Sequence, residues 1–370
     1  MKVGILTFHA ADNYGAVLQA YALKEYIRSL GHDTEILNYC PKSMQEEYHA
    51  FTWRLPMSFS GVRKYIFYIP AILRRLFLLI PRILFCWKFR LFRERFFDLK
   101  EAVYWKKEDI PHDLDAYVMG SDQVWNPRIS REGMDVYLGK FQTKPNALRI
   151  AYAASAGAGE EQLKSKDDFK LFQTVFVREE SLKEHLLNLG VFSELVADPT
   201  FLVEPNLWQQ VAEQSKYNTE GKYILVYMMY YTPEVLRIAK RFALQQRIKI
   251  KVISPFEFRY IAADHFLHPQ GPDDFVKLFR DAEYVITTSF HGTAFSVIFN
   301  KNFYFISTGQ KGENRLRSLL NKLGLEHRLV EDVENYDPID YTAVNEKLAK
   351  FREHSQQLLG NSLKVDHDKQ

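Results

Sequence analysis

The chain has 370 residues, of which 46% are hydrophobic and 26% charged, and its formal net charge is +3. This profile is typical of a soluble globular protein, and the length is natural for two domains. Two cysteines, Cys40 and Cys86, exclude a disulfide framework and a cysteine metal site and favour a reducing, cytoplasmic location. No apolar run reaches the ~18 residues that span a bilayer, and "MKVGILTFHA" is typical of a core strand rather than a signal peptide.

The first third of the chain opens with a strand, a helix and a second strand. Val3–Phe8 predicts a buried strand, Ala16–Leu30 a helix that ends at Gly31, and "DTEILNY" the next strand. This order favours a parallel sheet. An aromatic, basic segment interrupts the order at 41–110, and strands at Ala116–Met119 and in "LRIAYAASAGAG" then restore it.

The second half repeats the alternation of strand, polar loop and helix, from "TVFVREESLKEHLLNLG" to "KNFYFIST" and "GENRLRSLLNKLG". We therefore expect an α/β protein with two Rossmann-like domains facing a central cleft and a helical insertion in the first. The expected ranges are 1–155, with the insertion at about 41–110, then 156–345, and a final helix and tail at 346–370. Ligands of such sheets bind at the carboxyl ends of the strands, so the loops there are the candidate site.

The loop "TTSFHGTAFS" carries the sharpest signal. It follows a hydrophobic strand, and Ser289, His291, Gly292 and Thr293 open a helix whose free N–H groups favour phosphate or carboxylate. Gly292 would let an anion approach the backbone, and His291 can donate a proton near neutral pH. The alternative is a serine N-cap beside a histidine that only fills space.

Two arginines follow other strands. Arg178 lies between the apolar strand "TVFV" and a helix, where its fork would suit a carboxylate or phosphate. The alternative is a surface pair with Glu179 or Glu180. One of Arg315 and Arg317 in "GENRLRSLL" could face the same anion, or both could be solvent-exposed helix charges.

Two loops of the first half suit hydroxyl groups. In "MGSDQVWNP", Ser121, Asp122 and Gln123 could bind hydroxyls and Trp125 could stack on a sugar, although a turn with a buried tryptophan fits equally. "ADPT" offers Asp198, but Asp-Pro is often only a turn. The opening loop "HAADNYGAVLQA" lacks both glycine fingerprints of nucleotide loops, and its polar groups suit a polyol. These groups are His9, Asp12, Asn13, Tyr14 and Gln19.

The motifs "NYGAVLQAYAL", "GSDQVWNP" and "SFHGTAFS", in this order and with "VRE" and "ADPTF" between them, resemble the polysaccharide pyruvyl transferase family. The resemblance covers roughly residues 1–325 apart from the insertion. It implies a GT-B-like fold, phosphoenolpyruvate as donor, and a sugar of a polysaccharide or lipid-linked repeat unit as acceptor. The product would be a cyclic pyruvate ketal.

The resemblance also implies roles for particular residues. The donor side would comprise Arg178, Ser289, His291, Gly292, Thr293 and Arg315, with His291 as general acid. Many members have an arginine shortly before the His-Gly pair; Ser289-Phe290 stand here, and Arg315 could compensate. Asp12 or Asp122 could accept the hydroxyl proton. The acceptor side would comprise His9, Asn13, Tyr14, Gln19, Ser121, Gln123 and Trp125. No metal or further cofactor is expected, because no ligand cluster has the right spacing.

The segment 62–97 carries nine basic residues against one acid, Glu94. Its apolar positions share one sector of a helical wheel, and Pro70 and Pro81 predict two or three short helices. Such a cationic amphipathic segment is typical of contact with an anionic membrane surface. The alternative is a helical insertion packed on its own domain with solvated arginines. No nucleic-acid motif accompanies the charge, so nucleic acid is not an expected partner.

Two other functions compete with pyruvyl transfer. A GT-B glycosyltransferase with a sugar-nucleotide donor would need a diphosphate site and base-stacking residues in the second domain. A non-enzymatic glycan-binding protein would tolerate the loss of His291.

Overall fold

The computed structural model describes residues 1–41, 63–99, 102–255, 266–267, 270–309, 313–333 and 337–364. Of residues 63–79 it describes the backbone alone. The part of the expected insertion at 42–62 and the tail at 365–370 therefore lie outside the described residues.

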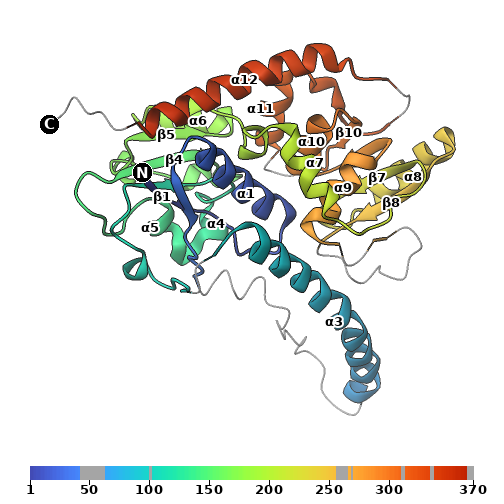
Figure 1. Cartoon of the computed structure of the whole chain (residues 1–370). Coiled ribbons are helices and arrows are strands. Elements are labelled where there is room, and N and C mark those ends of the chain that lie inside the picture. Colours follow the sequence, from blue (N-terminus) through green and yellow to red (C-terminus); the bar gives the residue numbers. More distant parts are fainter. Residues whose placement is uncertain are drawn as a thin grey trace.

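The first sheet has six parallel strands in the order β2-β1-β3-β4-β5-β6 (Figure 1). Its central strands are buried on both faces, which explains their continuous apolar sequence. The bounds of the strands are β1 Lys2–Leu6, β2 Asp33–Ile36, β3 Ala116–Met119, β4 Leu148–Ala154, β5 Thr174–Val177 and β6 Glu194–Leu195. The longer helices of this part are α1 Tyr14–Ser29, α3 Arg63–Phe96 and α6 Glu180–Asn188, with short helices α4 Pro127–Ser130 and α5 Met134–Tyr137.

The second sheet has five parallel strands in the order β11-β10-β9-β7-β8. Its strands are β7 Tyr223–Tyr227, β8 Lys249–Ile253, β9 Tyr284–Thr287, β10 Asn302–Ile306 and β11 Leu329–Val330. Its helices are α8 Pro233–Gln246, α9 Pro272–Asp281, α10 Phe290–Ile298 and α11 Asn314–Leu323. The 3₁₀ turn η5 Pro199–Phe201 and α7 Pro205–Glu213 connect the sheets, and α12 Tyr341–Ser362 follows the second sheet. The expected class, an α/β protein with two Rossmann-like domains, is confirmed by these two parallel sheets and their helices.

The division between the sheets falls later than the expected boundary near residue 155. β5 and β6 both lie after that point, yet β5 pairs with β4, with Ile150 opposite Thr174, and β6 extends the same sheet. Edge pairing decides which sheet a strand joins, and the alternation of elements along the chain does not reveal it. The sheets divide between Leu195 and Tyr223.

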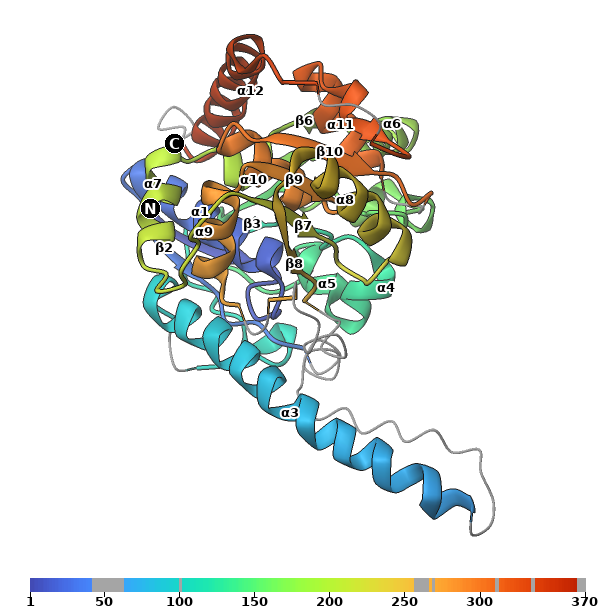
Figure 2. The ribbon, with the colours of Figure 1, turned by 90° about the vertical axis from the view of Figure 1, so that its right-hand side faces the viewer.

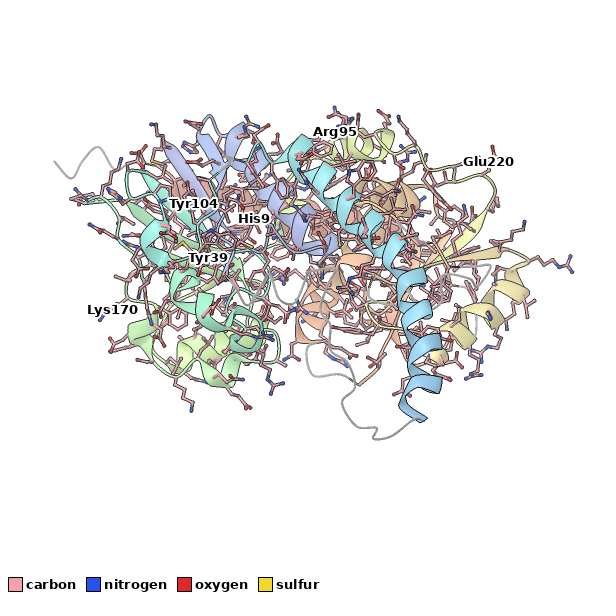
Figure 3. The ribbon with its side chains drawn as sticks, turned by 90° about the horizontal axis from the view of Figure 1, so that it is seen from below. His9, Tyr39, Arg95, Tyr104, Lys170 and Glu220 are labelled. Carbon is pink, nitrogen blue, oxygen red and sulfur yellow. The ribbon has the colours of Figure 1, made fainter. Side chains whose placement is uncertain are left out.

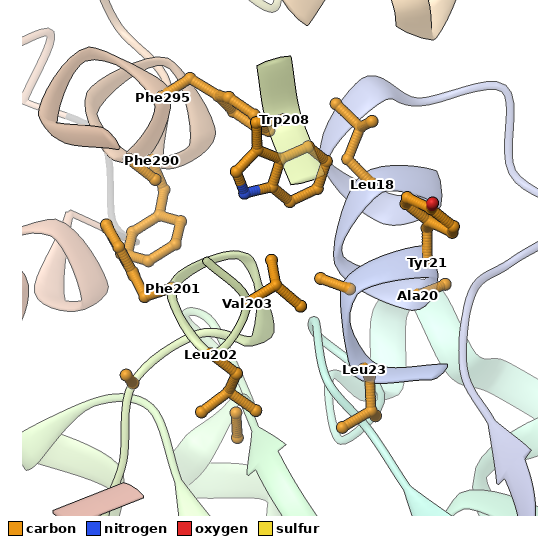
Figure 4. Packing of buried hydrophobic residues seen from close by; sticks show 14 of the residues in the cluster. Leu18, Ala20, Tyr21, Leu23, Phe201, Leu202, Val203, Trp208, Phe290 and Phe295 are labelled. Atoms are coloured by element: carbon orange, nitrogen blue, oxygen red, sulfur yellow. The ribbon is translucent and has the colours of Figure 1, made fainter. Parts of the chain in front are cut away.

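One continuous apolar cluster joins the two domains. Figure 4 shows Leu18 and Tyr21 of α1 on one side of Trp208 and Phe295 of α10 on the other, with residues of η5 and the turn after it below. The indole Nε1 of Trp208 donates to the carbonyl of Thr200 at 3.0 Å, which satisfies the polar atom of this buried ring. The last helix, α12, also returns to the first domain, where the Tyr26 hydroxyl donates to the carbonyl of Gln356 at 3.0 Å.

The expected short helices of the insertion form a single helix, α3, which runs through both Pro70 and Pro81. The prediction of a break was wrong because a proline removes one backbone donor and kinks a helix without always ending it. Figure 2 shows the first half of α3 projecting away from the two domains, while its second half lies against them. Within the described parts of the chain, no helix is both long enough and apolar enough to cross a membrane.

Candidate active site at the junction of the two sheets

Polar side chains from strand ends of both sheets meet at the junction of the domains. Asp122 follows β3, Arg178 follows β5 and Asp198 follows β6, all at the carboxyl edge of the first sheet. His291 follows β9 and Arg315 follows β10 in the second sheet. His291 lies 3.7 Å from Asp198, and Arg315 lies 3.9 Å from Asp122. Because each of these pairs joins one sheet to the other, the carboxyl edges of the two sheets face each other.

Arg178 is the centre of this junction cluster, which we define as Asp122, Arg178, Asp198, His291 and Arg315. The guanidinium of Arg178 is almost fully buried; its Nη1 donates to Asp198 Oδ2 at 2.5 Å and its Nη2 to Asp122 Oδ1 at 3.3 Å. It lies 4.7 Å from the ring centroid of Phe290, a cation–π distance. Burial alone would lower the pKa of Arg178, but the carboxylates of Asp198 and Asp122 outweigh it and raise that pKa.

Asp198 connects the arginine to the histidine. Its Oδ1 accepts from the backbone N–H of Thr200 at 3.0 Å and from the hydroxyl of the same residue at 2.8 Å. Its Oδ2, bound by Arg178, lies 3.7 Å from Nε2 of His291. Burial alone would raise the pKa of Asp198, but the neighbouring His291 and Arg178 outweigh it, so this pKa lies well below the usual range.

His291 lies in the first turn of α10, and its ring rests on α1 of the other domain. A Cβ atom added to Gly15 would lie 2.1 Å from Nδ1 of His291, so only glycine at that position permits this approach. The distance from Nε2 to Asp198 is too long for a hydrogen bond, and within the described residues this buried nitrogen has no partner. The ring is therefore held against α1, and its Nε2 is the nitrogen that could bind a ligand.

Arg315 adds a second guanidinium. Its Nη1 lies 3.9 Å from Asp122 Oδ1, and burial together with the charge of Arg178 lowers its pKa. Nearby, Glu179 accepts from the Ser155 hydroxyl and the Ala156 N–H through Oε1, and burial raises its pKa.

Several buried donors of the cluster have no acceptor. In the described part of the chain, this holds for Nε of Arg178, Nε of Arg315 and Nε2 of His291. Buried donors are normally paired, so two arginines and a histidine with donors left over fit a small anion. We find no group of three or more His, Cys, Asp or Glu side chains arranged to hold a metal within the described ranges.

The glycine predicted to admit an anion has another role. A Cβ atom at Gly292 would lie 2.2 Å from Oγ1 of Thr287, so the side chain of β9 already occupies the space that the missing Cβ leaves. Ser289 precedes α10 without a side-chain cap hydrogen bond, and its N–H donates to Thr287 Oγ1 at 3.1 Å. The hydroxyl of Thr293 is buried and has no partner within the described residues.

The two candidate carboxylates lie in different surroundings. Asp122 belongs to the junction cluster, with Arg178 and Arg315 beside it. Asp12 forms an ion pair with Arg93 of α3, in which Nη1 lies 2.9 Å from Oδ1. Only Asp122 is therefore in contact with the predicted anion-binding arginines.

Most residues expected on the acceptor side are part of the packed interior. The Trp125 indole is fully buried and donates to the carbonyl of Tyr137 at 2.9 Å, so it presents no face on which a sugar could stack. The Ser121 hydroxyl donates to the carbonyl of Ala153 at 3.1 Å, and Gln123 accepts from the Asn126 amide at 3.0 Å. These bonds favour the alternative reading of this loop, a turn with a buried tryptophan.

The opening loop is likewise bonded internally. His9 lies buried in the first domain (Figure 3), with its ring nitrogens 3.2 Å from the carbonyl of Thr7 and 3.1 Å from Oδ1 of Asn38, and burial lowers its pKa. Asn13 caps α1 by accepting from two backbone N–H groups. The amide of Gln19 donates to Oγ1 of Thr7 at 2.8 Å, and Tyr14 stacks on Phe275 with centroids 4.5 Å apart.

Two residues of the site were not among the predicted site residues. "ADPT" offers Asp198 after a strand, the same signal as in the other loops, but the frequency of Asp-Pro in turns kept it out of the predicted site. Gly15 was part of a recognised motif, but its role depends on a contact with His291, 276 positions later, that spacing alone does not reveal.

The fold and the junction cluster define a two-domain α/β protein with two arginines, two aspartates and a histidine gathered between its sheets. The sequence model of the family "Polysaccharide pyruvyl transferase" matches residues 13–310. The chain therefore belongs to the polysaccharide pyruvyl transferase family. No curated protein matches it significantly.

Solved structures of low sequence identity share much of its length. The UDP-GlcNAc 2-epimerase from Neisseria meningitidis is 9% identical, with 98% of this chain and 97% of that chain covered and a TM-score of 0.47. The UDP-GlcNAc 2-epimerase from Methanocaldococcus jannaschii is 11% identical, with 98% and 100% covered and a TM-score of 0.44.

Proposed function

We propose that this protein transfers the pyruvyl group of phosphoenolpyruvate to two hydroxyls of a sugar in a polysaccharide or lipid-linked repeat unit. The product is a pyruvate ketal, and phosphate is released. The observation that carries the proposal is the junction cluster, where Arg178, Arg315 and His291 converge from both sheets with donors left unpaired. Phosphoenolpyruvate carries a carboxylate and a phosphate, and both groups suit two guanidinium forks.

His291 is the residue best placed to start the reaction. Protonation of the methylene carbon of phosphoenolpyruvate makes C2 electrophilic, and Nε2 of His291 has no other partner within the described residues. Oδ2 of Asp198 lies 3.7 Å from that nitrogen. The first sugar hydroxyl then bonds to C2 and gives up its proton, for which Asp122 is the carboxylate within the cluster.

The second half of the reaction releases phosphate. The C2–O bond to phosphate breaks, and a second hydroxyl bonds to C2 to close the ketal. Of the two hydroxyl protons, one balances the proton added to the methyl group and the other leaves on phosphate. Arg178 and Arg315 would stabilise the charge that develops on the leaving phosphate.

The first experiment compares two arginines on the same helix. Arg315→Gln removes a guanidinium of the junction cluster, whereas Arg317→Gln removes one that is 59% exposed and pairs with Glu313. Losing one charge-assisted hydrogen bond corresponds to about 1.5–3 kcal/mol, so the Kd for phosphoenolpyruvate should rise at least tenfold in Arg315→Gln. Arg317→Gln should stay within about twofold of wild type, because surface ion pairs contribute little.

The second experiment tests the reaction. Radiolabel from phosphoenolpyruvate should enter an oligosaccharide panel with wild type and not with His291→Ala, while phosphoenolpyruvate still raises the melting temperature of both. A UDP- or GDP-sugar that raises the melting temperature when phosphoenolpyruvate does not would favour a sugar-nucleotide glycosyltransferase and refute the proposal. Normal transfer by His291→Ala would remove the general-acid role.

A further inference from the structure

One face of α3 attaches this helix to both domains. Phe85 and Phe89 are buried, and their rings lie 5.9 and 5.1 Å from that of Tyr14. Two ion pairs flank this contact. Arg93 binds Asp12 of the first domain at 2.9 Å, and Lys88 binds Asp274 of the second at 2.6 Å. The second half of α3 is therefore fixed in orientation relative to the junction.

The opposite face of α3 is apolar and exposed to solvent. Ile80, Leu84, Trp87 and Leu91 are spaced by four, three and four residues, which places them on one side of a helix. They are 65%, 41%, 51% and 41% exposed. We call these four residues the α3 stripe. Among the other residues whose exposure the structure describes, the exposed large apolar side chains, such as Leu244 on α8, do not follow this helical spacing over four positions.

The helix that carries the α3 stripe has a strongly basic sequence, of which Lys88 and Arg93 face the body and pair with Asp274 and Asp12. Residues 62–97 carry nine basic side chains and one acid, a local charge of +8, so the rest of the chain sums to −5. Arg95 is exposed, and Arg90 is 73% exposed beside its partner Glu94. An apolar row flanked by cations matches an anionic bilayer surface, into which apolar side chains insert while basic ones meet the headgroups.

We propose that the α3 stripe and its basic flanks dock this protein onto the surface of an anionic phospholipid bilayer. A second copy of the chain is the weaker occupant, since two α3 helices face to face would bring two strongly basic segments together. The first half of α3 projects away from the domains (Figure 2), so the helix extends beyond the body of the protein. This docking does not depend on the reaction that the junction cluster catalyses.

Vesicle co-sedimentation tests this docking. The full chain should bind vesicles of phosphatidylglycerol and phosphatidylcholine at low ionic strength, bind pure phosphatidylcholine at least tenfold more weakly, and lose affinity as salt rises. The double variant Trp87→Ser/Leu91→Ser should bind the phosphatidylglycerol vesicles at least tenfold more weakly than wild type. Its matched control, Leu187→Ser/Phe192→Ser, removes two exposed apolar side chains of the first domain, 65% and 76% exposed, and should bind like wild type.

Sedimentation velocity without lipid distinguishes docking on a bilayer from association between two copies of the chain. If wild type is a dimer that Trp87→Ser/Leu91→Ser converts to a monomer, and anionic vesicles bind neither protein, the α3 stripe is a contact between copies and the proposal is overturned. It is also overturned if the double variant binds vesicles as strongly as its control. Unchanged circular dichroism and melting temperature of the variant exclude misfolding as the cause.

Discussion

Gly15 offers a direct test of how the two domains build the site, because a single added methyl group there would meet His291. In Gly15→Ala the new Cβ would lie 2.1 Å from Nδ1 and 2.4 Å from Cε1 of the ring. Real Cβ contacts are essentially never below 3.0 Å. Either the imidazole moves or α1 moves, and overpacking of this kind costs about 1–3 kcal/mol. We expect that loss in the free energy of unfolding. Pyruvyl transfer should also fall, by about tenfold for each 1.4 kcal/mol that the displaced imidazole adds to the barrier.

Gly360→Ala is the matched control, since it makes the same change inside a helix where there is room. The nearest atom to its added Cβ would be Cδ1 of Leu30 at 4.0 Å. Replacing a helical glycine by alanine stabilises by up to about 1 kcal/mol, so this variant should be at least as stable as wild type and fully active. Chemical denaturation and the transfer assay measure both effects. If Gly15→Ala matches Gly360→Ala in stability and transfer, the ring does not rest on α1 as described.

Two further substitutions probe groups buried near the junction. Asp198→Asn removes the anion between Arg178 and His291 and should destabilise the fold by about 3–5 kcal/mol at neutral pH. Because the pKa of Asp198 is lowered in the folded state, its stabilisation is complete above the unfolded pKa of about 3.9 and is lost as pH falls through the lower folded value. The stability difference between wild type and variant, measured by denaturation, should thus be constant from pH 5 to 8 and shrink below about pH 4; a difference that grows in acid would contradict this. Trp125→Phe leaves the buried carbonyl of Tyr137 without its donor and should cost about 1–3 kcal/mol of stability, while the acceptor KM stays unchanged; a raised KM with normal stability would instead indicate sugar stacking.

The sequence predicts the junction cluster well because parallel strands end at one edge. Arg178, His291 and Asp122 each follow an apolar strand, and the carboxyl-edge rule brings such loops together without knowledge of the contacts. The same rule applies to Asp198, which the common use of Asp-Pro in turns obscured. Pairing at the sheet edge, which decided that β5 joins the first sheet, depends on contacts that no local pattern encodes.

Side-chain direction is the part that the sequence predicts least. Trp125 and Gln19 stand in motifs that suit a ligand, yet Nε1 of Trp125 donates to the carbonyl of Tyr137 and Nε2 of Gln19 donates to Thr7 and to the carbonyl of Ala16. Polarity and position do not distinguish a group that binds a substrate from one that closes a turn. The apolar sector predicted for α3 includes Leu84 and Trp87, which are exposed, whereas Phe85 and Phe89, outside that sector, pack on the body.

The shared apolar cluster of Figure 4 limits how this enzyme can open. Separating α1 from α10 would expose Trp208, Phe295 and Tyr21 to water, and α12 adds a second connection from the end of the chain to the first domain. The two sheets therefore belong to one cooperative folding unit, in contrast to domains joined by a linker. If the junction binds the substrates as proposed, they enter it through movements of loops and side chains that leave this apolar cluster intact. Half-chains cut between Leu195 and Tyr223 would each expose part of the apolar core that the two domains share.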